Sequence, residues 1–153
     1  MHKILFFLCF LCPGTIAVAQ VSYPYRDIKL EKPADYKSTE KMALSAATFI
    51  LTTPFKEADA DRGGALTFLK DWMAGTKDFQ FYYKGKALDI IDDLDLLSLF
   101  IAGMAKYTLE HKVEAVNPMT VDMNAAKLVL TYCDDPKNNF KLKKKYRKIL
   151  ENN

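Results

Sequence analysis

The sequence predicts an all-α protein: a single-domain bundle of five or six short helices, with a short extended aromatic segment after the second helix. Three observations support this prediction. Apolar residues recur at intervals of three and four positions in several stretches. Prolines and glycines separate these stretches. Residues 20–153 also form a chain long enough to bury one hydrophobic core without staples, so one domain is expected.

Residues 1–19 have the three parts of a secretory signal peptide. Lys3 gives a positively charged start, residues 4–11 are apolar, and Ala17-Val18-Ala19 is a small-residue cleavage site. The apolar run is too short to span a bilayer as a mature helix. We therefore expect an exported protein that is cut before Gln20. Retention of the segment as an uncleaved anchor is the alternative.

The region after the expected cleavage site divides in two. Residues 20–37 carry two prolines and no sustained periodicity, which predicts an extended lead-in. Residues 38–153 are expected to form the helical domain, because the apolar periodicity begins there.

The first half of this domain contains three expected helices. The first covers about residues 38–53, with an apolar face at helical spacing, and Pro54 ends it. The second covers about residues 61–74, and Gly75 stands where a left-handed C-terminal cap is expected. A short third helix is expected over residues 86–91.

The second half contains three more. The fourth helix, about residues 94–111, is apolar around most of its circumference, which predicts a central position in the bundle. Asp95 and Lys106 interrupt it and argue against a membrane span. The fifth covers about residues 120–133, and a sixth is expected to start near Asn139.

The stretch DWMAGTKDFQFYY, residues 71–83, gathers aromatic side chains. After Gly75, three aromatic residues alternate with Gln80 and Tyr82, which is the period of an extended segment. Such an arm either covers the core with its rings or forms a stacking surface for a sugar, a peptide or a partner. In the first case Tyr82 is the ring expected to stay outside. The candidate binding residues of this arm are Trp72, Phe79, Phe81, Tyr82 and Tyr83.

The same stretch resembles a pattern in small secreted helical proteins of Bacteroidota, over about residues 38–150. The matching positions are Trp72-Met73, Gly75-Thr76, Asp78-Phe79, Phe81, Ala105-Lys106-Tyr107, Tyr132-Cys133 and Pro136-Lys137-Asn138-Asn139. The resemblance implies a helical fold and a location in the periplasm or cell envelope of a Gram-negative bacterium. That family has no assigned activity, so the resemblance implies no functional residues.

The C-terminal segment KNNFKLKKKYRKILENN is strongly basic. On a helix its apolar residues occupy one side and its cations cover the remainder, so a docked helix with a solvated basic face is one interpretation. Binding of an acidic envelope polymer, an anionic lipid or an acidic partner is the other, with Lys143, Lys144 and Arg147 as candidate residues. The acidic cluster Asp89, Asp92, Asp93 and Asp95 offers a docking site for this tail, in the same chain or in another subunit.

Few residues suit catalysis or metal binding. Cleavage before Gln20 leaves one histidine, His111, and one cysteine, Cys133, too few for a zinc site built from these ligands. The stretch EADADRGG lacks the glycine and glutamate of a calcium loop, and its acids are expected to cap the second helix. Phosphate-binding glycine loops, HExxH and GxSxG are absent from the sequence. We expect no cofactor and no enzymatic activity.

Two functions remain. The first is an exported, non-enzymatic helical module that binds another cell-envelope protein. The second is binding of a small ligand or an anionic envelope polymer through the aromatic arm and the basic C-terminal helix. A net charge of +3, or +2 after loss of Lys3, does not favour nucleic acid in an exported protein. Oligomeric state and an intermolecular disulfide through Cys133 stay open.

Overall fold

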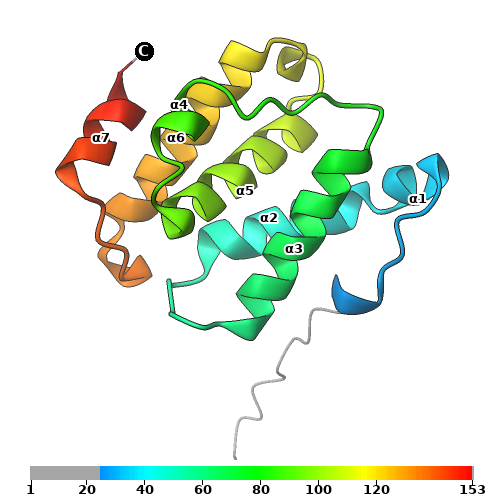
Figure 1. The fold of residues 1–153 in the computed structure, drawn as a ribbon, viewed down its shortest axis with the longest axis horizontal. Helices are drawn as coiled ribbons and strands as arrows, with labels where there is room; N and C mark the ends of the chain where they lie inside the picture. The colour runs from blue at the N-terminus through cyan, green and yellow to red at the C-terminus, as the bar shows by residue number, and fades with distance from the viewer. Residues whose placement is uncertain (1–24, 153) are drawn as a thin grey trace, which may run out of the picture.

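The computed structural model describes residues 25–152, so the expected signal peptide lies outside the described part of the chain. Seven α-helices and three short 3-10 helices make up the described part, which contains no strand (Figure 1). The prediction of an all-α fold is therefore confirmed. The α-helices are α1 (Pro33–Ser38), α2 (Glu40–Thr52), α3 (Ala60–Gly75), α4 (Lys86–Asp89), α5 (Leu94–Glu110), α6 (Pro118–Asp134) and α7 (Lys144–Glu151).

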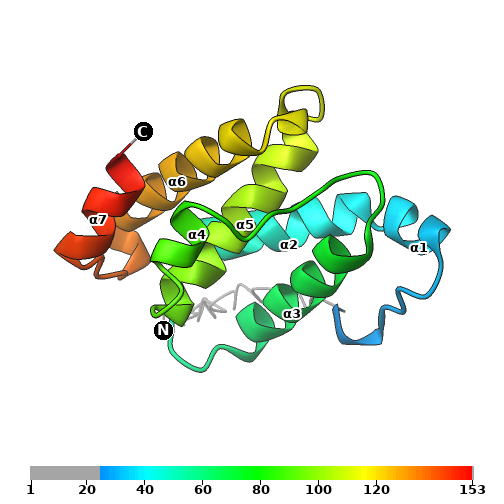
Figure 2. The same cartoon turned by 45° about the horizontal axis from the view of Figure 1, so that its top comes forward.

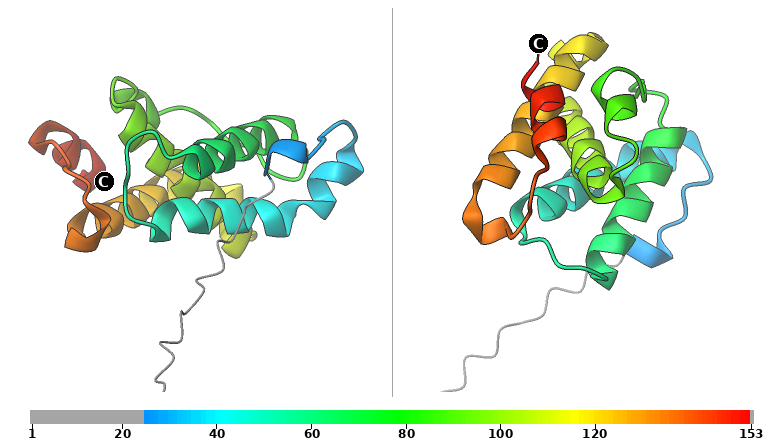
Figure 3. Two further views of the ribbon diagram at one scale, coloured as in Figure 1. Left: turned by 90° about the horizontal axis from the view of Figure 1, so that it is seen from below. Right: turned by 60° about the vertical axis from the view of Figure 1, so that its left-hand side comes forward.

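Helix α5 occupies the centre of the bundle. It packs between α2 and α6, while α3 packs on α2 and α7 on α6, so α1 and α7 lie at opposite edges (Figures 1 and 3). Eleven residues of α5 are buried, which confirms the central position that its apolar circumference predicts. The approach of α6 is close at Gly103, where an added Cβ would lie 3.1 Å from the Cα atom of Ala125.

The ends of the helices follow local chemistry. Asp59 begins α3, because its side chain accepts hydrogen bonds from the backbone N–H groups of Asp61 and Arg62. Asp93 begins α5 in the same way, through the N–H of Leu96. The cap at Asp59 is the role that the sequence predicts for the acids before α3. No helix among the described residues is long and apolar enough to cross a membrane.

Two predicted boundaries are wrong. The described part of the lead-in is not extended throughout, because α1 begins at Pro33. Proline suits the first position of a helix, since a backbone N–H there would have no acceptor within the helix. The last helix starts at Lys144 instead of near Asn139. Asn139 adopts a left-handed conformation, with φ at 53°, and ends the 3-10 turn Pro136–Asn138. A left-handed residue cannot continue into a right-handed helix.

Gly75 does not form the predicted left-handed cap. It is the last residue of α3, and Thr76 follows it in an extended conformation with φ at −64°. The glycine is needed for a different reason. A Cβ atom at this position would overlap the ring and hydroxyl of Tyr36, so Gly75 lets α1 approach the end of α3.

This contact gives a test with a matched control in the same helix. Gly75→Ala forces Tyr36 to move and is expected to lower the free energy of unfolding by about 1–3 kcal/mol. Gly63→Ala meets no atom within 4 Å and is expected to raise it by about 0.5–1 kcal/mol, through helix propensity alone. Urea denaturation of both variants checks the prediction. Equal effects of the two substitutions would contradict the proposed contact.

Candidate functional site

Three of the five aromatic candidates face the core. Trp72 is fully buried, and its indole N–H donates to the backbone carbonyl of Tyr36 at 2.9 Å. Phe79 and Phe81 are half-buried and each has its ring centre 6.1 Å from that of Trp72. These rings cover the core as the first interpretation of the arm requires, and the Trp72 ring is closed to a ligand.

The other two candidates are exposed. Tyr82 is 42 % exposed, as predicted, but Tyr83 is 44 % exposed, whereas the alternation predicted it to face inward. The segment joining α3 to α4 forms neither helix nor strand, so a regular extended arm is not confirmed. Its side chains do not alternate strictly between core and solvent. The Tyr82 hydroxyl donates to the Gln80 side chain, and the ammonium of Lys84 lies 5.4 Å from the Tyr82 ring centre.

The basic C-terminal candidates separate into two kinds. Lys143 pairs with Asp93 at 2.9 Å, which raises the pKa of the lysine and shows that the acidic cluster holds the tail within the same chain. Arg147 pairs with Asp134 and Glu151. Lys144 is exposed and makes no ion pair with the described residues. Two of the three candidates therefore hold α7 in place, and one projects into solvent.

A surface that the sequence analysis did not identify lies where α5 connects to α6. Val113 and Val116 are each 84 % exposed, and Met119 is 71 % exposed. Asn117 accepts a hydrogen bond from the N–H of Met119 and begins α6, which leaves these apolar side chains on the outside. In Figures 1 and 2 the segment that joins α3 to α4 runs along one side of the bundle, past α5, to α4.

Tyr82 of that segment meets the α5–α6 connection between two hollows. One has a volume of about 440 Å³ and the other about 480 Å³, and both are lined by Tyr82 and Pro118. Met119 lines the first and Val116 the second. We call this area the apolar surface; it consists of Tyr82, Val113, Val116, Pro118 and Met119. The signal in the sequence is the presence of two valines in the short, otherwise mostly polar connection between the helices, followed by Pro118 and Met119.

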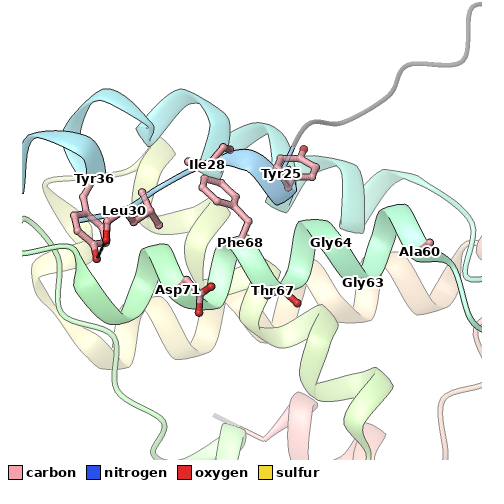
Figure 4. Close-up of a pocket in the computed structure, with 10 residues that line it drawn as sticks. All are labelled: Tyr25, Ile28, Leu30, Tyr36, Ala60, Gly63, Gly64, Thr67, Phe68 and Asp71. Carbon is pink, nitrogen blue, oxygen red and sulfur yellow. Dashed lines mark hydrogen bonds between the residues drawn. The ribbon is translucent and has the colours of Figure 1, made fainter. Parts of the chain in front are cut away.

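A third hollow of about 680 Å³, the largest of the three, lies between the lead-in and α3 (Figure 4). The rings of Tyr25 and Phe68 stack across it with their centres 5.4 Å apart, and the Tyr36 hydroxyl donates to the carbonyl of Leu30 at one end. Tyr25, which lines this hollow, is the first described residue of the chain. We therefore assign this hollow no ligand.

A buried arginine was also missed. The Arg62 guanidinium lies between the rings of Phe55 and Tyr132, 5.7 and 5.6 Å from their centres. One of its nitrogens donates to the backbone carbonyl and the hydroxyl of Thr53 at 3.4 Å. The residue joins the end of α2 to α3 and α6, and its cation is stabilised by the two aromatic faces. Its position is structural.

The described residues contain no group of three or more His, Cys, Asp or Glu side chains placed to hold a metal ion. His111 is an exposed residue at the end of α5, as predicted, with its ring stacked on Tyr107 at 4.6 Å. Cys133 is half-buried, and burial raises the pKa of its thiol to about 12. A thiol of that pKa is a poor nucleophile at neutral pH.

Cys133 allows a direct test in the chain from Gln20, where it is the single cysteine. With a pKa of about 12, roughly one thiol in ten thousand is ionised at pH 8. We expect iodoacetamide to label the native protein more than about a hundredfold more slowly than the urea-unfolded protein at that pH. Labelling at similar rates would show that the thiol is neither buried nor protonated in the fold.

Comparisons with known proteins do not assign the chain to a family. No protein-family model, no curated protein and no solved structure matches the chain. The resemblance to small secreted helical proteins of Bacteroidota therefore stays an expectation from the sequence. What the surface does has to be argued from its own residues.

Proposed function

We propose that this protein is a non-enzymatic helical module that binds another protein through the apolar surface. The observation that carries the proposal is the exposure of Val116 and Met119 beside Tyr82, with the exposed Val113 in the same connection. Single exposed apolar residues are ordinary, but a group of them flanked by hollows is typical of an interaction site. Aromatic residues and methionine are also enriched in the centres of protein–protein interfaces.

The fold does not depend on these side chains. The core around α5 is complete without Val113, Val116 or Met119, none of which is part of it. Their burial by a partner would stabilise a complex by about 1.5–3 kcal/mol for each side chain that is fully covered. Charged residues border the same area, among them Lys77, Asp78 and Lys112 in the hollow next to Val116. An apolar centre with a charged rim is the usual composition of an interface.

The kind of partner follows from the expected signal peptide. If residues 1–19 direct export, the partner is another protein of the cell envelope. This part of the proposal rests on the sequence alone, because these residues lie outside the described part of the chain. The surface itself is compatible with a partner in any compartment.

A polyanion remains the second candidate because five lysines of the tail are exposed and make no ion pair with the described residues. They are Lys137, Lys141, Lys144, Lys145 and Lys148. The hollows beside Tyr82 contain no residue of α7, so the aromatic arm and the basic helix do not form one site there. A polymer would therefore bind the helix alone and in a salt-dependent way.

The test is a pull-down from envelope extract with tagged residues 20–153. We expect wild type to retain one stoichiometric protein through a high-salt wash, because apolar contacts are not screened. Val116→Glu with Met119→Glu should abolish capture, since two carboxylates would be buried in the interface. Leu94→Glu is the matched control. Leu94 is 75 % exposed and lies at the opposite end of α5 from the connection.

Capture that survives the change of Val116 and Met119, or that is lost equally with Leu94→Glu, would contradict the proposal. Circular dichroism of each variant separates lost binding from lost folding. All three positions are exposed, so the three substitutions are expected to leave the helical spectrum unchanged.

The second candidate has its own variant. Lys141→Glu, Lys144→Glu and Lys148→Glu remove unpaired cations without touching Lys143 or Arg147, which hold α7. If the basic helix is the functional surface, the triple variant loses its retention on a dextran sulfate column at low salt. It then also loses capture of the envelope protein. We expect weaker retention on dextran sulfate but unchanged capture of the envelope protein.

A further inference from the structure

The hollow between Tyr82 and Met119 contains a carboxylate. Asp122 projects from the second turn of α6 and lines this hollow with Tyr82, Lys84, Gly85, Pro118 and Met119. Gly85 brings its backbone close to the acid; it adopts φ of 56°, and an added Cβ would lie 3.5 Å from a carboxylate oxygen of Asp122. The remaining walls are largely apolar, so the acid lies in surroundings that hydrate it poorly.

No cation of the described chain forms an ion pair with Asp122. Lys84 lines the same hollow, but its ammonium lies 5.4 Å from the centre of the Tyr82 ring. Asp122 itself is half-buried. Burial raises the pKa of its carboxyl group, and Lys86 opposes this through its charge and its backbone N–H. The Lys86 ammonium instead donates to the carbonyls of Ile149 and Asn152 at the end of α7.

The incompletely compensated charge costs free energy in the isolated protein. Half-burial of a carboxylate removes part of its hydration, and the charge of Lys86 offsets this loss only in part, because the pKa stays raised. Such a cost in folding free energy is typical of functional sites, where a ligand or a partner supplies the missing interaction. The hydrogen bond from the Lys86 N–H requires an acceptor oxygen at position 122 but not a negative charge. The charge itself is therefore unexplained by the fold.

We propose that this hollow receives an arginine or lysine side chain of the partner, whose cation pairs with Asp122. The aliphatic stem would lie against Pro118 and Met119, and the cation would reach the carboxylate beside the Tyr82 ring. A hollow of about 440 Å³ has room for such a side chain. The inference rests on the proposed function, because it names the residue type that anchors the partner on the apolar surface.

Charge complementarity with Asp122 favours a cationic anchor over the other classes of side chain. An acidic side chain would place two like charges in one poorly hydrated hollow. A purely apolar side chain would bury the carboxylate further without a partner, which is strongly unfavourable. A guanidinium supplies several N–H donors that match a carboxylate and packs well on an aromatic face.

The experiment uses two probes of nearly the same shape, one charged and one neutral. Butylguanidinium carries the cation on a short apolar stem, and butylurea has nearly the same shape but is neutral. Each is titrated into ¹⁵N-labelled residues 20–153, and amide shifts are followed by NMR. We expect saturable shifts at residues 82–86 and 119–123 for butylguanidinium, with a dissociation constant in the millimolar range because the probe is small. Butylurea should give none.

Asp122→Asn isolates the charge, because the amide keeps the oxygen that accepts the bond from Lys86. We expect at least about tenfold weaker binding of butylguanidinium. The matched control is Asp71→Asn, the same change in the largest hollow, which should leave binding unchanged. The thermal midpoint of Asp122→Asn at neutral pH should equal or exceed that of wild type, because the raised pKa shows that folding disfavours the charged form.

Three results would overturn the inference. Butylurea could bind as tightly as butylguanidinium, Asp122→Asn could bind butylguanidinium as tightly as wild type, or butylguanidinium could give no saturable shifts at these residues. Tyr82→Leu gives a second variant and should also weaken binding, through loss of the aromatic face. A failed probe experiment leaves the pull-down intact, so the two proposals fail separately. If capture depends on Val116 and Met119 while the probe does not bind, the surface binds a partner without a cationic anchor.

Discussion

The apolar circumference of α5 is the constraint on which the rest of the structure depends. A helix that is apolar on almost every side is stable only when other elements surround it, and eleven of its residues are buried here. Helices α2 and α6 cover two sides of it, and both present small residues at the contact, including Ala46 and Ala125. The short approach at Gly103 lets α6 lie close enough to exclude water.

The outer elements are held by a few specific contacts to this core. Asp93 both caps the first turn of α5 and pairs with Lys143 ahead of α7, so one carboxylate links the start of the central helix to the C-terminal helix. At the other edge, the indole N–H of Trp72 donates to the Tyr36 carbonyl, and Gly75 leaves room for the Tyr36 ring. The segment that leaves α3 is thereby directed over the core towards the α5–α6 connection. That path brings Tyr82 next to Pro118 and Met119.

The sequence predicts the α-helices other than α1 and the central place of α5, because hydrophobic periodicity reports directly which faces are buried. It fails where distant residues decide. Gly75 has the local appearance of a cap, but Tyr36 determines its role. The exposure of Tyr82 was predictable from alternation, whereas that of Tyr83 was not. Asp122 and Met119 were not identified, because they become candidates only when folding places them beside Tyr82 and Gly85.

The central claim is that a partner contacts the α5–α6 connection. Photo-crosslinking tests it most directly, with a benzophenone amino acid placed at Val116 in one sample and at Leu94 in another, each incubated with envelope extract and irradiated. Both positions are exposed, at 84 % and 75 %, and lie at opposite ends of α5. The account predicts one adduct of defined mass from position 116 and none from position 94. Adducts of equal yield from both positions, or an adduct from position 94 alone, would contradict it.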